Sequence, residues 1–170
     1  MMWRSLTLGV VTGLRSQLPT AMLAWRQSRE QLPEDLGGPV GILGRRGAVP
    51  ASALAAVGEL VADKLPRTPS RLDAGPFLGR LSLGATAGAG IAAAFGGSRI
   101  LGGVLGIAGA AAGSHAGARY RARVAERTDI PDAVWAVAED VTAIALALAA
   151  TRAAVHEGAQ HPCGRARFSR

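Results

Sequence analysis

The sequence predicts an all-α, multi-pass transmembrane bundle of four to five helices, with four spans and one further helix that is either re-entrant or a fifth span. Three observations support this fold class. Alanine and glycine supply 58 of the 170 residues, whereas phenylalanine, tryptophan and tyrosine supply only seven. Long uncharged segments recur along the chain, and the cations lie mainly between them. Because lipid provides no hydrophobic drive between helices, small side chains that allow close backbone approach suit a membrane bundle better than a water-soluble core.

The two clearest predicted spans are residues 81–98 and 100–118, which lack acidic and basic residues apart from His115. At 1.5 Å per residue they are about 27 to 29 Å long, close to the hydrocarbon thickness of about 30 Å. We expect a helical hairpin that turns at residues 96–99. Small residues repeat every four positions on each helix and predict packing ridges, which include Gly84 and Gly88 on the first and Gly109, Gly113 and Gly117 on the second.

The first apolar segment, residues 6–25, contains Arg15 and Pro19 and is flanked by Trp3 and Trp25. We predict one continuous helix, on which the two tryptophans would be about 33 Å apart, as interfacial anchors are. A cleaved signal peptide is the competing interpretation. It is disfavoured because Arg15 follows the hydrophobic stretch at once and no small-x-small cleavage site stands after it.

Residues 50–65 form a shorter predicted helix whose uncharged part ends at Glu59, so we expect a re-entrant or interfacial element, with a fifth span as the alternative. The last predicted helix covers residues 132–155 and begins with acidic and proline residues typical of a helix start. Residues 156–170 show no periodicity and are predicted to be a disordered tail. The domain organisation is therefore one membrane domain, residues 1–155, and a tail.

The net charge of +7 does not indicate a nucleic-acid partner, because no aromatic residues alternate with the cations. The cations instead flank the apolar segments, as in an inner-membrane protein that crosses the bilayer several times. The expected partners are the lipid bilayer and, through the glycine ridges, further copies of the chain; no ligand is indicated. The sequence contains no catalytic or metal-binding motif, so we expect no enzyme and no cofactor.

Ionisable residues within or beside the apolar segments predict a polar centre formed by Arg15, Glu59, Asp63 and Asp140. Glu59 and Asp63 lie four residues apart on one helix face and require a cation. The candidates are Lys64, Arg67 and Arg15, and a pair of Arg15 with Glu59 or Asp63 would explain how the first apolar segment tolerates an arginine. Of the adjacent pair Glu139 and Asp140, we expect only Asp140 to face the bundle. The alternative to a functional centre is a structural salt-bridge cluster that fixes the helix register.

Two motifs resemble a family of small bacterial membrane proteins, the domain-of-unknown-function family four-one-two-six. They read GLRSxLP at residues 13–19 and GExxxDKxPRTP at residues 58–69. The similarity continues through the glycine-rich hairpin, the Gly117-x-x-Tyr120-Arg121 sequence and the acidic pair at 139 and 140. The resemblance implies a multi-pass membrane protein and no established activity, ligand or catalytic residue.

The function that these patterns favour is passage of a small solute or ion through the polar centre. This expectation rests on ionisable residues in otherwise apolar helices. The alternative is a structural or scaffold membrane protein that associates through its glycine-zipper helices.

Overall fold

The computed structural model describes residues 2–32, 41, 47–62, 72–127 and 132–152. Within these ranges the chain forms six helices and no strand, which confirms the all-α class. The predicted tail, residues 156–170, lies outside the described residues. The helices are α1 (Met2–Leu14), α2 (Leu18–Ser28), α4 (Ala48–Ala62), α5 (Ala74–Ala94), α6 (Arg99–Arg127) and α7 (Asp132–Arg152).

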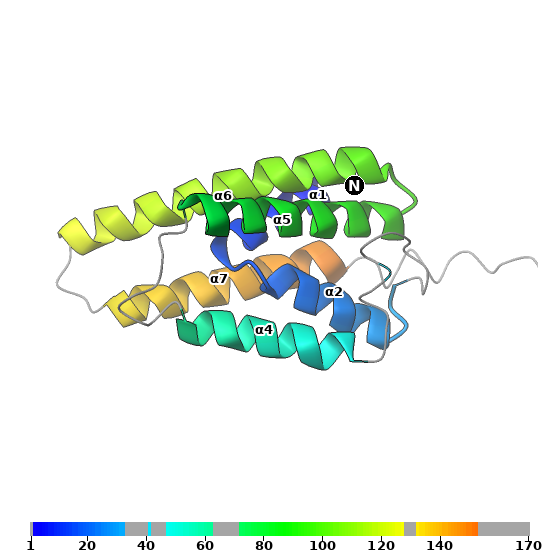
Figure 1. Cartoon of the computed structure of the whole chain (residues 1–170), viewed down its shortest axis with the longest axis horizontal. Helices are drawn as coiled ribbons and strands as arrows, with labels where there is room; N and C mark the ends of the chain where they lie inside the picture. Colours follow the sequence, from blue (N-terminus) through cyan, green and yellow to red (C-terminus); the bar gives the residue numbers. More distant parts are fainter. Residues whose placement is uncertain (1, 33–40, 42–46, 63–71, 128–131, 153–170) are drawn as a thin grey trace, which may run out of the picture.

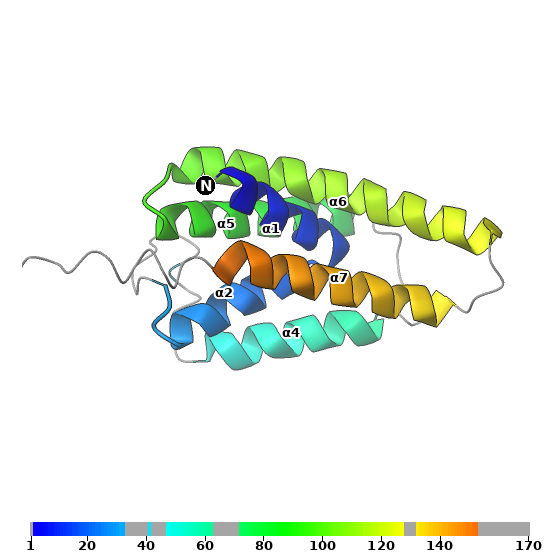
Figure 2. The same ribbon diagram turned by 180° about the vertical axis from the view of Figure 1, so that it is seen from behind.

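Three long helices run along the length of the bundle, whereas α1 and α2 form a hairpin whose tip lies inside it (Figure 1). The view from behind shows α1 beside α6 and α2 beside α4 (Figure 2). Three described segments are long and apolar enough to cross a bilayer, namely Ala74–Ala94, Arg99–Val124 and Val134–Arg152. Large apolar side chains such as Leu54, Leu78 and Ile100 are exposed on the outer surface, as expected for a bundle in lipid.

The prediction of one continuous first helix is wrong. The chain leaves the helix after Leu14 and begins α2 at Leu18, so Trp3 and Trp25 do not mark opposite ends of one span. Pro19 supplies the physical reason, since a proline lacks the N–H that an uninterrupted helix would bond to the carbonyl of Arg15. The break divides this segment into two helices, α1 and α2, and the shorter helix predicted at residues 50–65 is present as α4.

The predicted hairpin between the two glycine-rich helices is present, and it turns at residues 95–98 with Gly96 at a φ of +67°. Both helices are longer than the apolar count suggested. The first begins at Ala74, so it contains Arg80, and the second continues to Arg127. The uncharged run thus located the centres of the helices but not their ends.

Helices α1, α5 and α6 approach one another through glycines. A Cβ added at Gly106 would lie within 3.0 Å of the backbone of Gly84, and one at Gly109 within 3.0 Å of Leu6, Gly9 and Val10 backbone atoms. The same closeness holds for Gly84, Gly88 and Gly113, whereas Gly117 is buried on α6. Only a residue without a side chain allows such contact, so these glycines hold the three helices at backbone distance.

We expect Gly106→Ala to lower the free energy of unfolding by about 1 to 3 kcal/mol, because the new methyl group would meet backbone that cannot move aside cheaply. Gly103→Ala on the same helix is the matched control. Its Cβ would lie 3.6 Å from the carbonyl oxygen of Ala85, an ordinary contact. Reversible unfolding in mixed detergent micelles measures both, and equal stability of the two variants would contradict this packing.

Candidate functional site

The turn between α1 and α2 places irregular backbone inside the bundle. Arg15 is only 3% exposed, although it lies where the helix has ended. The end of α1 leaves carbonyl groups without helical partners, and side chains from two other helices bind them. Arg80 Nη1 donates to the carbonyl oxygen of Gly13 at 3.0 Å, and Ser114 Oγ donates to the same oxygen at 3.4 Å. The negative end of the α1 dipole thus faces a guanidinium.

The start of α2 is capped by Glu59 of α4. The backbone N–H of Ser16 donates to Glu59 Oε1 at 2.7 Å, and that of Gln17 donates to Oε2 at 2.9 Å. The Ser16 hydroxyl adds a third hydrogen bond at 2.5 Å. A carboxylate at this position satisfies exposed N–H groups and complements the positive end of the helix dipole.

Glu59 also joins the two helix ends to each other. Arg80 Nη2 lies 3.3 Å from Glu59 Oε1, and both side chains are largely buried, at 7% and 12% exposure. Arg80 at the end of α1 and Glu59 at the start of α2 therefore form one ion pair with each other. A pair this buried is stable only with further hydrogen bonds, which the two backbone segments provide.

A second group of charged side chains connects the turn between α1 and α2 to helices α6 and α7. Arg15 Nε donates to the Asp140 carboxylate, and Arg15 Nη1 lies 3.9 Å from Glu139 Oε1. Glu139 also accepts a hydrogen bond at 3.0 Å from Nε of Arg121 on α6. Together with Glu59 and Arg80, this polar network contains three guanidinium groups and three carboxylates.

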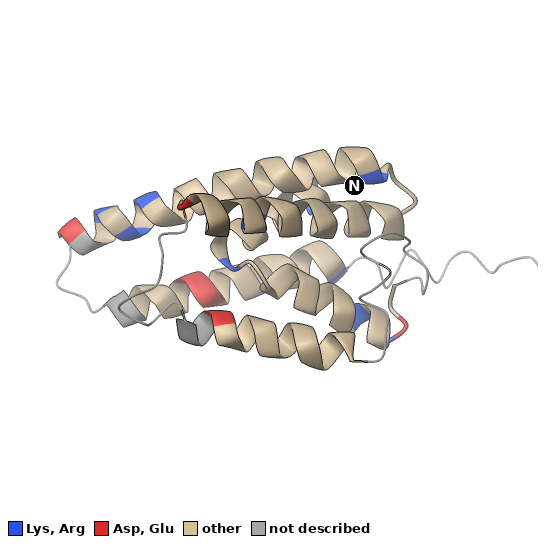
Figure 3. Cartoon of the chain, viewed as in Figure 1, with Lys and Arg blue, Asp and Glu red and all other residues tan. Residues whose placement is uncertain are grey.

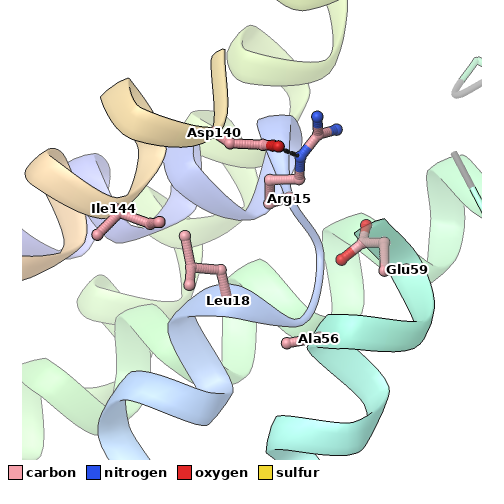
Figure 4. Close-up of a pocket in the computed structure, with 6 residues that line it drawn as sticks. All are labelled: Arg15, Leu18, Ala56, Glu59, Asp140 and Ile144. Carbon is pink, nitrogen blue, oxygen red and sulfur yellow. Dashed lines mark hydrogen bonds and ion pairs between the residues drawn. The ribbon is translucent and has the colours of Figure 1, made fainter. Parts of the chain in front are cut away.

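A pocket opens beside the network. It has a volume of about 30 Å³, room for about one water molecule, and is lined by Arg15, Leu18, Ala56, Glu59, Asp140 and Ile144. In Figure 4 the Arg15 and Asp140 side chains meet on one side of the pocket, whereas Glu59 and Ala56 approach from α4 on another. Charged and apolar side chains thus share one small hollow between α2, α4 and α7.

Three members of the predicted polar centre, Arg15, Glu59 and Asp140, line this pocket, and Asp63 lies outside the described residues. Of the two pairings expected for Arg15, the one with Glu59 is absent among the described residues, and Asp63, the partner in the other, lies outside them. Glu59 instead binds Ser16, Gln17 and Arg80, and Arg15 turns to the acidic pair on α7. The break in the first helix causes this change, because it presents N–H groups that Glu59 satisfies.

The expectation that only Asp140 faces the bundle is also wrong, because Glu139 is the more buried of the two. The sequence contains a signal for this. Glu139 lies three residues after Ala136 and four before Ala143, both buried, so it continues their stripe on α7. Arg80 is not among the predicted site residues, because it immediately precedes the predicted span at 81–98, whereas α5 has already begun at Ala74.

The chemistry of the network is electrostatic. No group of three or more His, Cys, Asp or Glu side chains that could hold a metal ion occurs among the described residues. The hydroxyl groups of Ser16 and Ser114 bind a carboxylate and a carbonyl, and neither bonds to a histidine among the described residues. The described residues thus form a cluster of ion pairs beside a small pocket.

Comparison with known proteins adds a family. The model of a family described as a domain of unknown function (DUF4126) matches residues 3–159, which include all of the described helices except Met2 at the start of α1. No curated protein and no solved structure matches the chain.

We expect Glu59→Gln to lower the free energy of unfolding by about 3 kcal/mol, because it removes the carboxylate that pairs with the buried Arg80 and weakens the α2 cap. Glu126→Gln, which changes an exposed carboxylate on α6, is the matched control and should shift stability by less than about 0.5 kcal/mol. Unfolding in mixed micelles measures both variants. Equal effects would show that Glu59 does not stabilise the break.

Proposed function

Since the chain belongs to the DUF4126 family, whose description names no activity, we propose its function from the geometry of its site. It is a multi-pass protein of the inner membrane that passes a small solute or ion through the polar centre. The observation that carries this proposal is the break between α1 and α2, where ionised side chains border a pocket inside an otherwise apolar bundle.

Broken helices of this kind are a recurring feature of membrane transporters. Their half-helix ends and unwound backbone present partial charges near the bilayer midplane, where a substrate exchanges for the protein's own polar groups. Here Glu59 and Arg80 occupy the two helix ends. Charged residues within membrane helices are costly, and they commonly mark the path of an ion or a charged substrate.

Helix α4 is the element best placed to open the pocket. It packs mainly against α2, and most of its other side chains are exposed, with Leu54 at 73% and Val57 at 57%. It nevertheless carries Ala56 and Glu59 of the pocket wall. A small outward movement of α4 would withdraw Glu59 from the α2 start and widen the pocket while α5, α6 and α7 keep their places.

The packing of the glycines gives less support to the scaffold alternative. A zipper that recruits partner helices must present its small residues outward. Gly84, Gly88, Gly106, Gly109 and Gly113 instead meet other helices of the same chain. These glycines therefore pack helices of the same chain together and do not offer their close contacts to a partner helix.

We expect Ala56→Leu to reduce flux through the protein about tenfold, equivalent to about 1.4 kcal/mol in the barrier, by filling the pocket without altering any charge. Ala55→Leu is the matched control because its neighbouring position is exposed. Proteoliposomes loaded with a pH-sensitive dye report proton flux, and light scattering reports the entry of urea and glycerol. Equal flux through both variants, in every assay in which the unaltered protein is active, would contradict passage through this pocket.

Water access to the pocket can be tested separately. In a Cys163→Ser background, Ala56→Cys should react with a charged, membrane-impermeant thiol reagent, whereas Ala55→Cys should be protected by lipid. The measurement is the rate of modification in proteoliposomes by mass spectrometry. If the two cysteines react at the same rate, the pocket is not the hydrated part of α4.

A further inference from the structure

At the end of the bundle that holds the α5–α6 turn, Arg4 is buried, and no carboxylate among the described residues forms an ion pair with it. Its exposure is 9%, and its guanidinium carbon lies 4.0 Å from the ring centre of Phe95 and 5.2 Å from that of Trp3. Nη1 of Arg4 has no hydrogen-bond partner within the described part of the chain. A guanidinium stacked on aromatic rings keeps its in-plane donors available to a further acceptor, and phosphate is the acceptor that this fork fits best.

Arg26, near the end of α2, repeats this arrangement. It is 7% exposed, lies 5.1 Å from the Trp25 ring centre, and donates through Nη1 to Gln31 Oε1 at 2.6 Å. Its Nε also has no hydrogen-bond partner among the described residues. Two buried arginines beside tryptophans thus point to one kind of ligand at this end.

The charge at this end is one-sided. Its described residues include five arginines but one carboxylate, Glu30 (Figure 3). Four of the arginines lie on α1, α2, α6 and α7, and the fifth follows α2 directly. The arginines are Arg4, Arg26, Arg29, Arg99 and Arg152. At the opposite end α6 carries Arg119, Arg121, Arg123 and Arg127, but Glu139 binds Arg121, and Glu126 and Asp73 add negative charge. An anion is therefore attracted to the α5–α6 turn end.

The neighbouring surface identifies the anion as part of a lipid. Trp3 and Trp25 are 51% and 38% exposed, and Met2, Leu6 and Ile100 are exposed at the same end. Indole rings beside arginines are typical of the level at which lipid headgroups meet the acyl chains. A soluble phosphate would use the arginines but would gain nothing from these apolar side chains.

We propose that this end of the protein binds anionic phospholipid, with the lipid phosphate held by the guanidinium of Arg4 and a second phosphate by that of Arg26. The site is separate from the pocket beside Glu59, and it does not depend on passage of any solute. Its ligand class is a phosphodiester lipid whose headgroup leaves a net negative charge, such as phosphatidylglycerol. One such interaction with an arginine near the surface corresponds to about fivefold enrichment of the anionic lipid over a zwitterionic one.

Tryptophan fluorescence tests the proposal directly. A protein with Trp25→Phe and Trp135→Phe retains Trp3 as its single reporter beside Arg4. It is reconstituted in phosphatidylcholine vesicles that contain an equal fraction of either brominated phosphatidylglycerol or brominated phosphatidylcholine. Preferential quenching by the phosphatidylglycerol, lost in Arg4→Gln, is expected. Equal quenching by the two brominated lipids would overturn the proposal.

A control variant distinguishes specific binding of the lipid by Arg4 from general electrostatic attraction of anionic lipid to this end of the protein. Arg99→Gln removes an exposed arginine at the same end and should keep most of the preference. A loss as large as that in Arg4→Gln would overturn the assignment of Arg4. Loss of the preference in millimolar inorganic phosphate at constant ionic strength would overturn a lipid ligand in favour of soluble phosphate.

A second reporter guards against misfolding of Arg4→Gln. With Trp3→Phe and Trp135→Phe, Trp25 reports on Arg26. Arg26→Gln should then remove the preference seen by Trp25. Retention of the full preference in this variant would overturn the assignment of Arg26, and circular dichroism of each variant shows whether its helices are intact.

Discussion

The structure depends on ending one helix and starting another inside an apolar bundle. A broken backbone presents carbonyl and N–H groups that cost several kcal/mol each if they are left without partners in hydrocarbon. Arg80 binds the carbonyl side of the break, Glu59 binds the N–H side, and the two bind each other. The charges match the two helix dipoles, so a single ion pair stabilises both ends.

This arrangement is possible only because α1, α5 and α6 lie at backbone distance. Gly13 fits against Ala110 and Ser114 of α6, which brings the Ser114 hydroxyl to the Gly13 carbonyl. Gly84 allows α5 to approach α6, and four residues before it Arg80 reaches the same carbonyl. The polar network therefore depends on the glycine packing, because the close approach of the helices sets the distances over which the network forms its hydrogen bonds.

The charges serve different physical roles at different depths. Within the bundle, the six ionised groups of the polar network neutralise one another around a pocket, where partner exchange costs less than exposing a lone charge to lipid. At the end with the α5–α6 turn, buried arginines stack on aromatic rings while the described carboxylates lie mostly elsewhere. The first pattern suits a site that rearranges, and the second suits a site that holds an external anion.

Local features of the sequence determined much of the architecture. The alanine and glycine content and the uncharged runs gave the helical class and the α5–α6 hairpin, because spans and close packing follow from composition and spacing. The same patterns selected Arg15, Glu59 and Asp140. Only the tertiary structure decided that Pro19 divides the first segment, since a proline can kink or end a helix according to what neighbouring elements satisfy. It also decided that Glu59 pairs with Arg80, a residue 21 positions away on another helix, and that Glu139 is buried. Ion-pair partners depend on how helices are placed in space, and no local pattern encodes that placement.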